Sequence, residues 1–284
     1  MRIRFWKMQG AANDFVLVDD RGETFPAGDR DWIAAISARR TGIGCEGVIL
    51  IQPSRRADFR MRFFNPDGSE VEMCGNGARC VARLANEIGA APARLSIETE
   101  AGILQAEVLG GEVRVQLTPP KDWRLGQRLT AAGRELVYGF VNTGVPHAVV
   151  EVEDLEGWDV RAVGRALRRH EAFAPAGTNA NFIRVTGPQT LSVRTYERGV
   201  EDETLACGTG ITASALIAAR SGRVRPPVRV TPASGDTLTV DFALTEAGAE
   251  NVTLTGPAVH VFQGTVEYPL PDVPERQQTM TVND

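Results

Sequence analysis

The sequence predicts an α/β (α+β) protein of two pseudo-symmetric lobes, in each of which strands surround a central helix. The first observation is a duplicated motif, because Cys74-Gly75-Asn76-Gly77 recurs 133 positions later as Cys207-Gly208-Thr209-Gly210. The same spacing, without a gap, pairs Gly89 with Gly222. The second observation is the length of 284 residues, which exceeds the usual size of one domain. Two copies of one supersecondary plan explain both observations.

Short strands make up most of the predicted first half. A turn of small residues at 9–14 separates the first two strands and places Asn13 just before the second. Apolar Trp32, Ile33 and Ile36 recur at helical spacing and predict a helix at 29–40. Strands are predicted at 3–8, 15–19, 48–52, 59–64, 95–99, 103–109 and 113–118.

Each cysteine turn is followed by a predicted helix. After Cys74, apolar residues recur at i, i+3, i+4 and i+7, and Gly89 is placed to end the helix as its C-cap. The second helix, 211–219, is apolar on nearly every side, which is typical of a helix buried all round. Strands wrapped around a central helix would bury such a helix on every side, and we expect this arrangement in both copies.

The second half repeats the order of the first. Strands are predicted at 136–142, 148–152, 182–185, 191–196, 228–230, 237–242, 251–255 and 258–262, with a helix at 160–169. Pro119-Pro120 marks the expected boundary between an N-terminal lobe, 1–119, and a C-terminal lobe, 120–263. A last strand at about 264–268 is expected to return to the first lobe. The polar tail, 269–284, is expected to be flexible.

Composition narrows the class of partner. The formal charge of −5 and pI near 5.4 give no general attraction to nucleic acid or to an anionic membrane, so the expected partner is a small molecule. Four cysteines are too few for a disulfide scaffold at this length. No signal peptide and no run of ~18 to 20 apolar residues is found, so we expect a cytoplasmic protein.

The cysteine turns are the candidate chemical groups. A cysteine at a helix start lies near unpaired backbone N–H groups and the positive end of the helix dipole, which favours the thiolate. The same N–H groups can hold a carboxylate, and the glycines let a ligand approach the backbone. If Cys74 and Cys207 face one cleft, one sulfur can remove a proton from the carbon beside that carboxylate while the other delivers a proton to the opposite face.

The sequence favours this inversion chemistry without a cofactor. No phosphate-binding or dinucleotide-binding glycine loop is present, so no nucleotide is expected, and stabilisation of a carbanion by hydrogen bonds replaces a pyridoxal electron sink. No metal is expected either, because none of the three histidines has a ligand-like spacing to a cysteine. Cys45 and Cys80 are expected to be buried packing residues.

Several stretches over nearly the whole chain resemble the diaminopimelate epimerase family of pyridoxal-independent enzymes. They are Lys7-Met8-x-Gly-x-x-Asn13-Asp14-Phe15, Phe64–Glu70, Cys74–Cys80, Pro146-His147, Gly177-Thr178-Asn179, Tyr196–Gly199 and Ala206–Gly210. The resemblance implies two lobes, each a barrel-like, mostly antiparallel sheet around a central helix, with the site in the cleft between them. It implies interconversion of LL- and meso-2,6-diaminopimelate, an isomerase step in lysine and peptidoglycan precursor synthesis. A homodimer is the assembly we expect, although no residue pattern defines it.

By this resemblance Cys74 and Cys207 are the acid/base pair. Gly75, Asn76, Gly208 and Thr209 are expected to donate hydrogen bonds to the reacting carboxylate. The residues expected to hold the distal amino-acid end of the substrate are Asn13, Asn65, Asn179, Glu197 and Arg198. Ammonium and carboxylate groups at that end match Glu197 and Arg198 in charge.

The chain departs from the family pattern at two positions. Val145 stands where many members have asparagine, and Gly47 stands where some have glutamine, so neither position supplies a side-chain amide. Two alternatives remain at this point: a proline or hydroxyproline racemase on the same plan, and a non-enzymatic thiol protein, either a redox sensor or an amino-acid binding module. The racemases usually carry histidine where this chain has Asn76, and their small substrates leave no role for Glu197 and Arg198.

Overall fold

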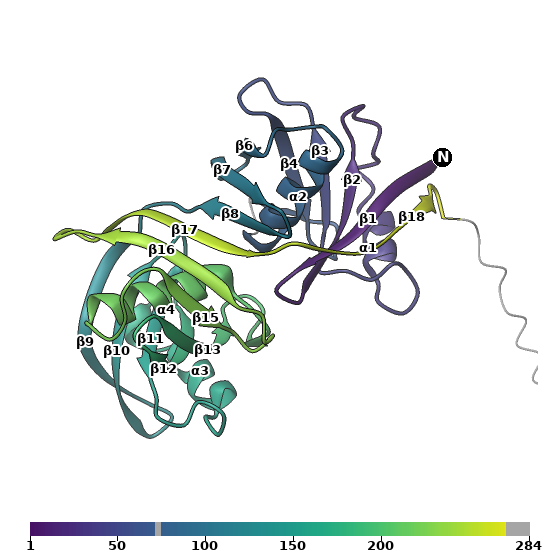
Figure 1. Cartoon of the computed structure of the whole chain (residues 1–284). Coiled ribbons are helices and arrows are strands. Elements are labelled where there is room, and N and C mark those ends of the chain that lie inside the picture. The colour runs from purple at the N-terminus through teal and green to yellow at the C-terminus, as the bar shows by residue number, and fades with distance from the viewer. Residues whose placement is uncertain (72–74, 271–284) are drawn as a thin grey trace, which may run out of the picture.

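The computed structural model describes residues 1–71 and 75–270 (Figure 1). Its first half contains β1 (Arg2–Gly10), β2 (Asn13–Asp19), α1 (Arg30–Ser37), β3 (Val48–Gln52), β4 (Phe59–Phe64), β5 (Glu70–Val71), α2 (Gly75–Glu87), β6 (Arg94–Thr99), β7 (Gly102–Leu109) and β8 (Glu112–Gln116). Its second half contains β9 (Lys121–Ala131), β10 (Arg134–Asn142), β11 (Pro146–Glu151), α3 (Val160–Arg168), η1 (Glu171–Phe173), β12 (Asn179–Gly187), β13 (Thr190–Glu197), β14 (Asp202–Thr204), α4 (Gly208–Arg220), β15 (Val228–Thr231), β16 (Leu238–Leu244), β17 (Ala249–Pro257) and β18 (Val259–Glu267).

The predicted duplication is present in the backbone. Helices α2 and α4 begin and end at positions related by the 133-residue offset, and the glycine after each helix has a left-handed conformation, with φ of +68° at Gly89 and +70° at Gly222. In the parallel pair β2–β3, Val16 lies opposite Val48, and in β11–β12 the offset positions Val149 and Asn181 lie opposite each other. The two lobes are therefore copies in strand register as well as in sequence.

Each central helix is the middle of a hydrophobic core. Val81 and Leu84 of α2 are fully buried against a cluster that includes Phe15 and Ile97. Helix α4 is buried from Gly210 to Ala219, as its apolar sequence predicts. Burial of a large aliphatic side chain is worth roughly 1.5–3 kcal/mol, so these helices anchor their lobes by packing. Figure 1 shows the strands of each lobe around its helix.

The shorter helices cover the outer faces of the sheets. Trp32, Ile33 and Ile36 of α1 pack in one cluster with strand residues of the first lobe, and α3 packs likewise in the second lobe. Helix α1 ends at Ser37 rather than at the expected residue 40, because Ala38 is extended, with ψ of 126°. The chain then folds back on the helix, and the Gly44 N–H donates to the Ile36 carbonyl.

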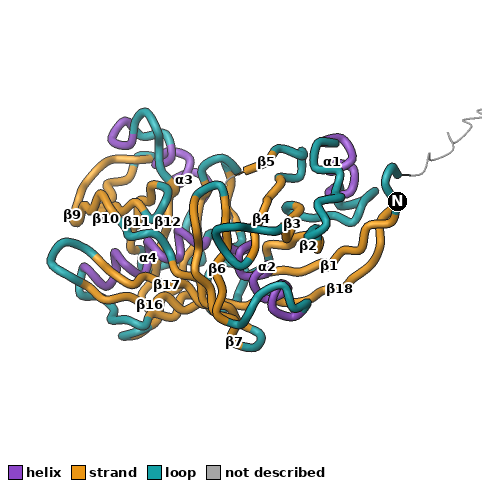
Figure 2. The backbone as a smooth tube through the Cα atoms, turned by 90° about the horizontal axis from the view of Figure 1, so that it is seen from above, coloured by secondary structure: helices purple, strands orange, loops and turns teal. Residues whose placement is uncertain are grey.

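Two long strands connect the lobes. Strand β17 pairs with β16 on one side and, from Thr253 to Pro257, with β8 on the other. Strand β18 then pairs with β1 along its length, with Gln9 opposite Val259 and Arg2 opposite Glu267. Figure 2 shows β1 and β18 side by side. The sequence predicted two separate strands here, whereas the structure has one, interrupted only by a register shift between Lys7 and Met8.

Strand β9 was not expected from the sequence. It is almost entirely exposed and polar, so it lacks the alternation that identifies a half-buried strand, and it forms by pairing with β10. The exact division of the chain into lobes stays a prediction, and the tail beyond Leu270 lies outside the described residues. Within the described part, no helix has the length and hydropathy needed to cross a membrane.

Candidate active site

Cys207 is the N-cap of α4. Its backbone is extended, with φ −113° and ψ 108°, and the helix begins at Gly208. The side chain is 7% exposed, and its Sγ lies 3.5 Å from Thr209 Oγ1. The first N–H groups of the helix and its positive dipole end therefore lie beside this sulfur, and taken alone they favour its thiolate form.

The Glu197 carboxylate lies next to Cys207. Glu197 ends β13, and its carboxylate accepts hydrogen bonds from the Cys207 thiol and, at 2.9 Å, from Thr204 Oγ1. Burial raises the pKa of Glu197 above its ordinary value, and the two hydrogen bonds oppose that effect only in part. A carboxylate in contact with the thiol can stabilise or exchange its proton.

Asn179 and Arg198 form a second polar group in the same lobe. Asn179 opens β12; its Nδ2 donates to the Pro146 carbonyl at 3.0 Å, and its Oδ1 accepts from the Arg198 backbone N–H at 2.8 Å. The Arg198 guanidinium donates to the Ala176 carbonyl at 3.1 Å. The structure thus brings Asn179 to Arg198, the neighbour of Glu197, and holds both through backbone contacts.

The sequence did not single out His147 as a site residue, although it lies in the Pro146-His147 motif. It is fully buried on β11, directly opposite Asn179, and its Nδ1 lies 3.1 Å from Asn181 Nδ2. Burial, together with the nearby Arg198 charge, lowers the pKa of His147 to about 3. The imidazole is therefore neutral at physiological pH. One sequence signal could have pointed to this polar network. Asn179 and Asn181 are two polar residues that come just before the apolar strand residue Phe182.

The start of α2 meets the start of α4. Asn76 Nδ2 donates to the Ala206 carbonyl at 3.4 Å, and Asn76 Oδ1 accepts from Arg79 at 2.8 Å. A Cβ added at Gly208 would lie 3.7 Å from Asn76 Oδ1. A Cβ added at Gly75 would have no described atom within 4 Å, so its backbone is open to a ligand. Cys74, which precedes Gly75, lies outside the described residues, and its role stays a prediction.

Asn13 and Asn65 come from the first lobe. Asn13 opens β2 opposite Gly10, where an added Cβ would lie 3.3 Å from the Asn76 carbonyl oxygen. Asn13 Oδ1 is buried without a hydrogen-bond partner among the described residues. Asn65 follows β4, and its Nδ2 donates to Ser69 Oγ at 3.2 Å within its own loop. The structure therefore places Asn13 beside the α2 start, while the hydrogen bonds described for Asn65 stay local.

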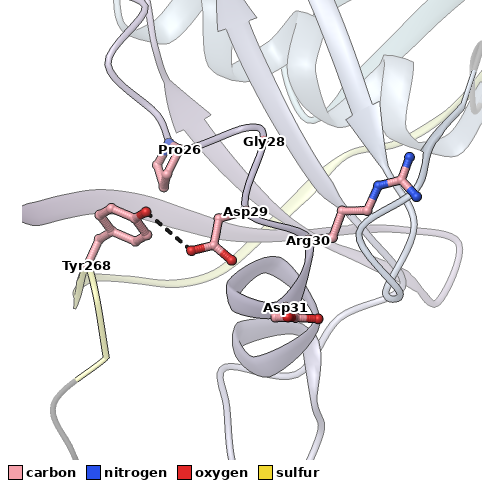
Figure 3. Close-up of a pocket in the computed structure, with 6 residues that line it drawn as sticks. All are labelled: Pro26, Gly28, Asp29, Arg30, Asp31 and Tyr268. Carbon is pink, nitrogen blue, oxygen red and sulfur yellow. Dashed lines mark hydrogen bonds between the residues drawn. The ribbon is translucent and has the colours of Figure 1, made fainter.

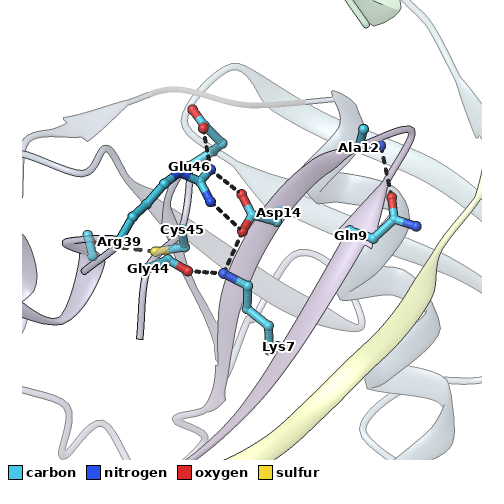
Figure 4. Close-up of polar contacts among 9 residues, drawn as sticks. Lys7, Gln9, Ala12, Asp14, Arg39, Gly44, Cys45 and Glu46 are labelled. Carbon is cyan, nitrogen blue, oxygen red and sulfur yellow. Dashed lines mark hydrogen bonds and ion pairs between the residues drawn. The ribbon is translucent and has the colours of Figure 1, made fainter. Parts of the chain in front are cut away.

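An ion-pair cluster of buried Lys7, partly buried Asp14 and exposed Arg39 lies next to Asn13 in the sequence; Figure 4 shows its contacts. Asp14 binds Lys7 at 2.6 Å and Arg39 at 2.7 Å, and Lys7 also donates to the Gly44 carbonyl. Although burial raises it, hydrogen bonds from Arg39 and Lys7 keep the pKa of Asp14 below its ordinary value. The cluster fixes β1 and β2 against the loop after α1, and so holds Asn13 in place.

Packing explains why position 47 carries no side-chain amide. A Cβ at Gly47 would lie 2.3 Å from the Phe63 ring, so this chain has no room for a longer side chain there.

Cys45 and Cys80 are buried in the first lobe, as expected for packing residues.

Two surface pockets of the described chain lie elsewhere. One, of about 710 Å³, is open and lies at the start of α1, where Tyr268 Oη donates to Asp29 at 3.2 Å (Figure 3). The other, of about 390 Å³, is lined by residues of β6, β7 and β8 together with Asp58 and Thr253. Neither contains a cysteine, so neither carries the predicted chemistry.

Comparison with known proteins identifies the family. The family model described as diaminopimelate epimerase matches residues 5–123 and 139–261. The chain belongs to the diaminopimelate epimerase family. It is 46% identical over 274 residues to the diaminopimelate epimerase of Aquifex aeolicus, covering 92% of this chain and 97% of that one. It is 44% identical over 263 residues to that of Chlorobaculum tepidum, covering 91% and 99%.

Solved structures of other proteins share the fold of this diaminopimelate epimerase family member. A PhzF-family phenazine biosynthesis protein of Bacillus anthracis has a TM-score of 0.72 at 18% identity, covering 94% of this chain and 99% of that one. A probable proline racemase of Agrobacterium radiobacter K84 has a TM-score of 0.67 at 16% identity, covering 94% and 93%. These likenesses support the predicted fold class. Family membership makes the chain an isomerase, which sets aside the non-enzymatic thiol protein.

Proposed function

We propose that this chain interconverts LL- and meso-2,6-diaminopimelate by proton transfer between Cys74 and Cys207, without a cofactor, in lysine and peptidoglycan precursor synthesis. The observation that carries the proposal is the position of Cys207, at the start of α4 and in contact with Glu197, where the start of α2 meets it through Asn76. Membership of the family supplies the substrate class.

In the proposed reaction, one cysteine thiolate takes the α-proton from one face of the substrate. The C–H bond breaks, an S–H bond forms, and the electron pair is delocalised into the carboxylate. The opposite thiol then gives its proton to the other face and becomes the thiolate, so no atom or electron is gained or lost. Backbone N–H groups at Gly75 and Gly208, with Asn76 and Thr209, are proposed to stabilise the carboxylate as charge develops on it.

The distal end of the substrate is proposed to lie among Asn13, Asn65, Asn179 and Arg198. The Arg198 guanidinium pairs with the distal carboxylate, and the asparagine amides supply donors and acceptors. Glu197 is proposed to have two partners, because a carboxylate has enough lone pairs to accept from Cys207 and from the distal ammonium.

The direct test is incubation of reduced protein with LL-diaminopimelate in deuterated water, without added pyridoxal phosphate, metal or nucleotide. The meso product should carry one deuterium at the inverted carbon, as measured by chiral chromatography with mass spectrometry. Absence of exchange would overturn the proposal. Proline should turn over far more slowly, because it leaves Glu197 and Arg198 without partners, and equal turnover of proline would favour the racemase alternative.

The two-cysteine step is tested by Cys74→Ser and Cys207→Ser. A hydroxyl has a far higher pKa than the ~8.5 of a free thiol, so inversion should fall by orders of magnitude in both variants. The remaining thiol can still take the proton it faces, and a 3-halo diaminopimelate analogue reports this by loss of halide. The two variants should prefer opposite stereoisomers. A shared preference would contradict the mechanism.

Assembly and location are separate proposals. We propose a homodimer, which light scattering after size-exclusion chromatography would test, and a cytosolic location.

A further inference from the structure

Asn181 is a fully buried polar side chain for which the proposed reaction has no role. It lies on β12, two residues after Asn179, and is surrounded by three groups. Its Nδ2 lies 2.9 Å from the Ala148 carbonyl and 3.1 Å from His147 Nδ1, and its Oδ1 lies 3.0 Å from Thr195 Oγ1. All of its neighbours in this network belong to β11, β12 and β13.

These contacts determine which end of the amide faces the histidine. A backbone carbonyl can only accept, so the atom beside the Ala148 oxygen must be the NH₂ group. The second proton of that NH₂ group then points at His147 Nδ1. Thr195 completes the arrangement, because its hydroxyl donates to Oδ1. Reversing the amide would place two oxygens 2.9 Å apart, so the orientation is fixed chemically.

The amide orientation in turn fixes the proton of His147. Nδ1 accepts from Asn181 and carries no proton, so the single proton of the neutral ring is on Nε2. Nε2 is buried and has no hydrogen-bond partner among the described residues. Among the described residues, Arg198 acts on the ring electrostatically, and its positive charge disfavours a second proton. The imidazole is therefore a neutral N–H donor.

The network also contacts the helix that carries Cys207. A Cβ added at Gly210 would lie 2.4 Å from Asn181 Oδ1 and 3.4 Å from Cys207 Sγ. Asn181 thus fills the space that a side chain at position 210 would need. The amide that orients His147 is packed against the same turn that presents the cysteine.

We propose that Asn181 is a positioning residue of this site, which holds His147 as the neutral Nε2–H tautomer and so keeps an uncharged hydrogen-bond donor beside Asn179 and Arg198. The proposal rests on the proposed function for its catalytic consequence, but not for the tautomer itself. Thr195 supports the role by orienting the Asn181 amide.

The tautomer can be measured without any activity. The chain has three histidines, so ¹⁵N-histidine labelling gives three rings, and the His147→Gln variant identifies the signals of His147. Long-range proton–nitrogen spectra should show a protonated Nε2 and an unprotonated Nδ1, unchanged from pH 6 to 9. An Nδ1–H tautomer, or an imidazolium at pH 7, would overturn the proposal even if the protein is an active epimerase.

Asn181→Asp tests the positioning role. A carboxylate cannot donate to Nδ1, so the His147 ring should gain a proton there. We expect kcat/KM to fall roughly tenfold to a hundredfold, by analogy with groups that orient metal-binding histidines. Its pH profile should gain an ionisation that wild type lacks. An unchanged tautomer in the folded variant would contradict the role.

Thr195→Val and Thr195→Ser form a matched pair that leaves Asn181 in place. The valine variant removes the donor to Asn181 Oδ1, whereas serine keeps the hydroxyl. Activity should be lower by severalfold in the valine variant than in the serine variant, with the His147 nitrogen signals broadened or shifted only in the former. Equal activity and identical spectra would show that Thr195 does not orient the amide.

Discussion

At the scale of single residues, the contact between Glu197 and Cys207 leads us to expect that the carboxylate takes part in the proposed proton chemistry. Burial raises the pKa of Glu197 above its ordinary value of 4.5. The carboxylate therefore takes up a proton at a higher pH than an exposed glutamate, and a protonated carboxyl cannot stabilise or accept the cysteine proton. Activity should be lost on the acid side at a pH above 4.5.

Glu197→Gln is expected to remove this ionisation. The amide keeps the size of the side chain but cannot take a proton, so kcat/KM should fall by roughly a hundredfold and lose the corresponding acid limb. Glu201→Gln is a matched control, because Glu201 binds Arg168 at 2.9 Å instead of the cysteine. Stopped or continuous assays across pH 4 to 9 would check both variants. A Glu201 effect as large as that of Glu197 would refute the assignment.

His147 makes folding sensitive to acid. Its pKa is about 3 in the folded protein and 6.5 in the unfolded chain. Between these pH values the unfolded chain binds more protons than the folded protein. The stability that the neutral His147 ring contributes is therefore complete above pH 6.5 and is lost as the pH falls towards 3. The free energy of unfolding should drop by about 1.4 kcal/mol per pH unit in this window. Urea unfolding of wild type and His147→Gln at pH 6.5 and 5.0 tests this, because the variant should lack this part of the slope. The same slope in both would contradict the burial of a neutral ring.

Sequence reasoning reached some of these residues and missed others for a physical reason. Glu197 and Arg198 were found because they lie in a motif and carry charges that suit the substrate. Asn181 and His147 matter through burial and through hydrogen bonds between β11 and β12, which depend on strand register. Register is set by packing and is not visible in one strand alone. Cys74 was predicted from its motif, and its place in the site remains untested.

At the scale of elements, the glycine positions of the two cysteine turns differ in whether they have room for a methyl group. A methyl group at Gly210 would collide with Asn181 Oδ1 at 2.4 Å, and Asn181 cannot move without breaking its buried hydrogen bonds. Gly210→Ala should therefore destabilise the protein by about 1–3 kcal/mol, as overpacking generally does. Gly75→Ala is the control, because its methyl group would meet no described atom within 4 Å and alanine favours a helix. Urea unfolding of both variants tests the difference, and similar midpoints would show that Asn181 is not held rigidly.

Helix prediction succeeded where periodicity was strong. The apolar positions of α2 and the continuous apolar run of α4 identified both central helices. Strand β9 was missed because it is exposed on both faces, and its stability comes from pairing with β10. Such a strand has no sequence period of its own, so its existence depends on its neighbour.

At the scale of the whole molecule, duplication preserved the backbone while the polar groups diverged. The 133-residue offset relates Asp14 to His147. In the first lobe this position is charged and bound to Lys7 and Arg39, and in the second lobe it is a neutral buried ring. The first lobe thus uses the position to fix a turn, and the second uses it to present a donor. Symmetry of fold therefore does not imply symmetry of chemistry.

The lobes are joined through β18, which makes the end of the described chain part of the first lobe. Phe262 packs edge-on against Phe5, with ring centroids 5.9 Å apart. Trp32 packs edge-on against Tyr268, with ring centroids 5.2 Å apart. The Trp32 indole also donates to the Glu267 carbonyl at 3.2 Å. Removal of β18 would expose these rings and leave β1 without its partner strand.

Truncation after Ala258 should therefore weaken the first lobe selectively, and truncation after Leu270 is the control, because it leaves every one of these contacts in place. The four tryptophans make this measurable, since Trp6 and Trp32 lie in the first half and Trp123 and Trp158 in the second. Replacing either pair with phenylalanine gives a fluorescence reporter for the other half. In the longer chain both reporters should unfold together, because β17 and β18 connect the lobes in one continuous sheet. After Ala258 the first-half reporter should unfold at lower urea than the second-half reporter. Coincident transitions in the shorter chain would mean that the first lobe does not depend on its returning strand.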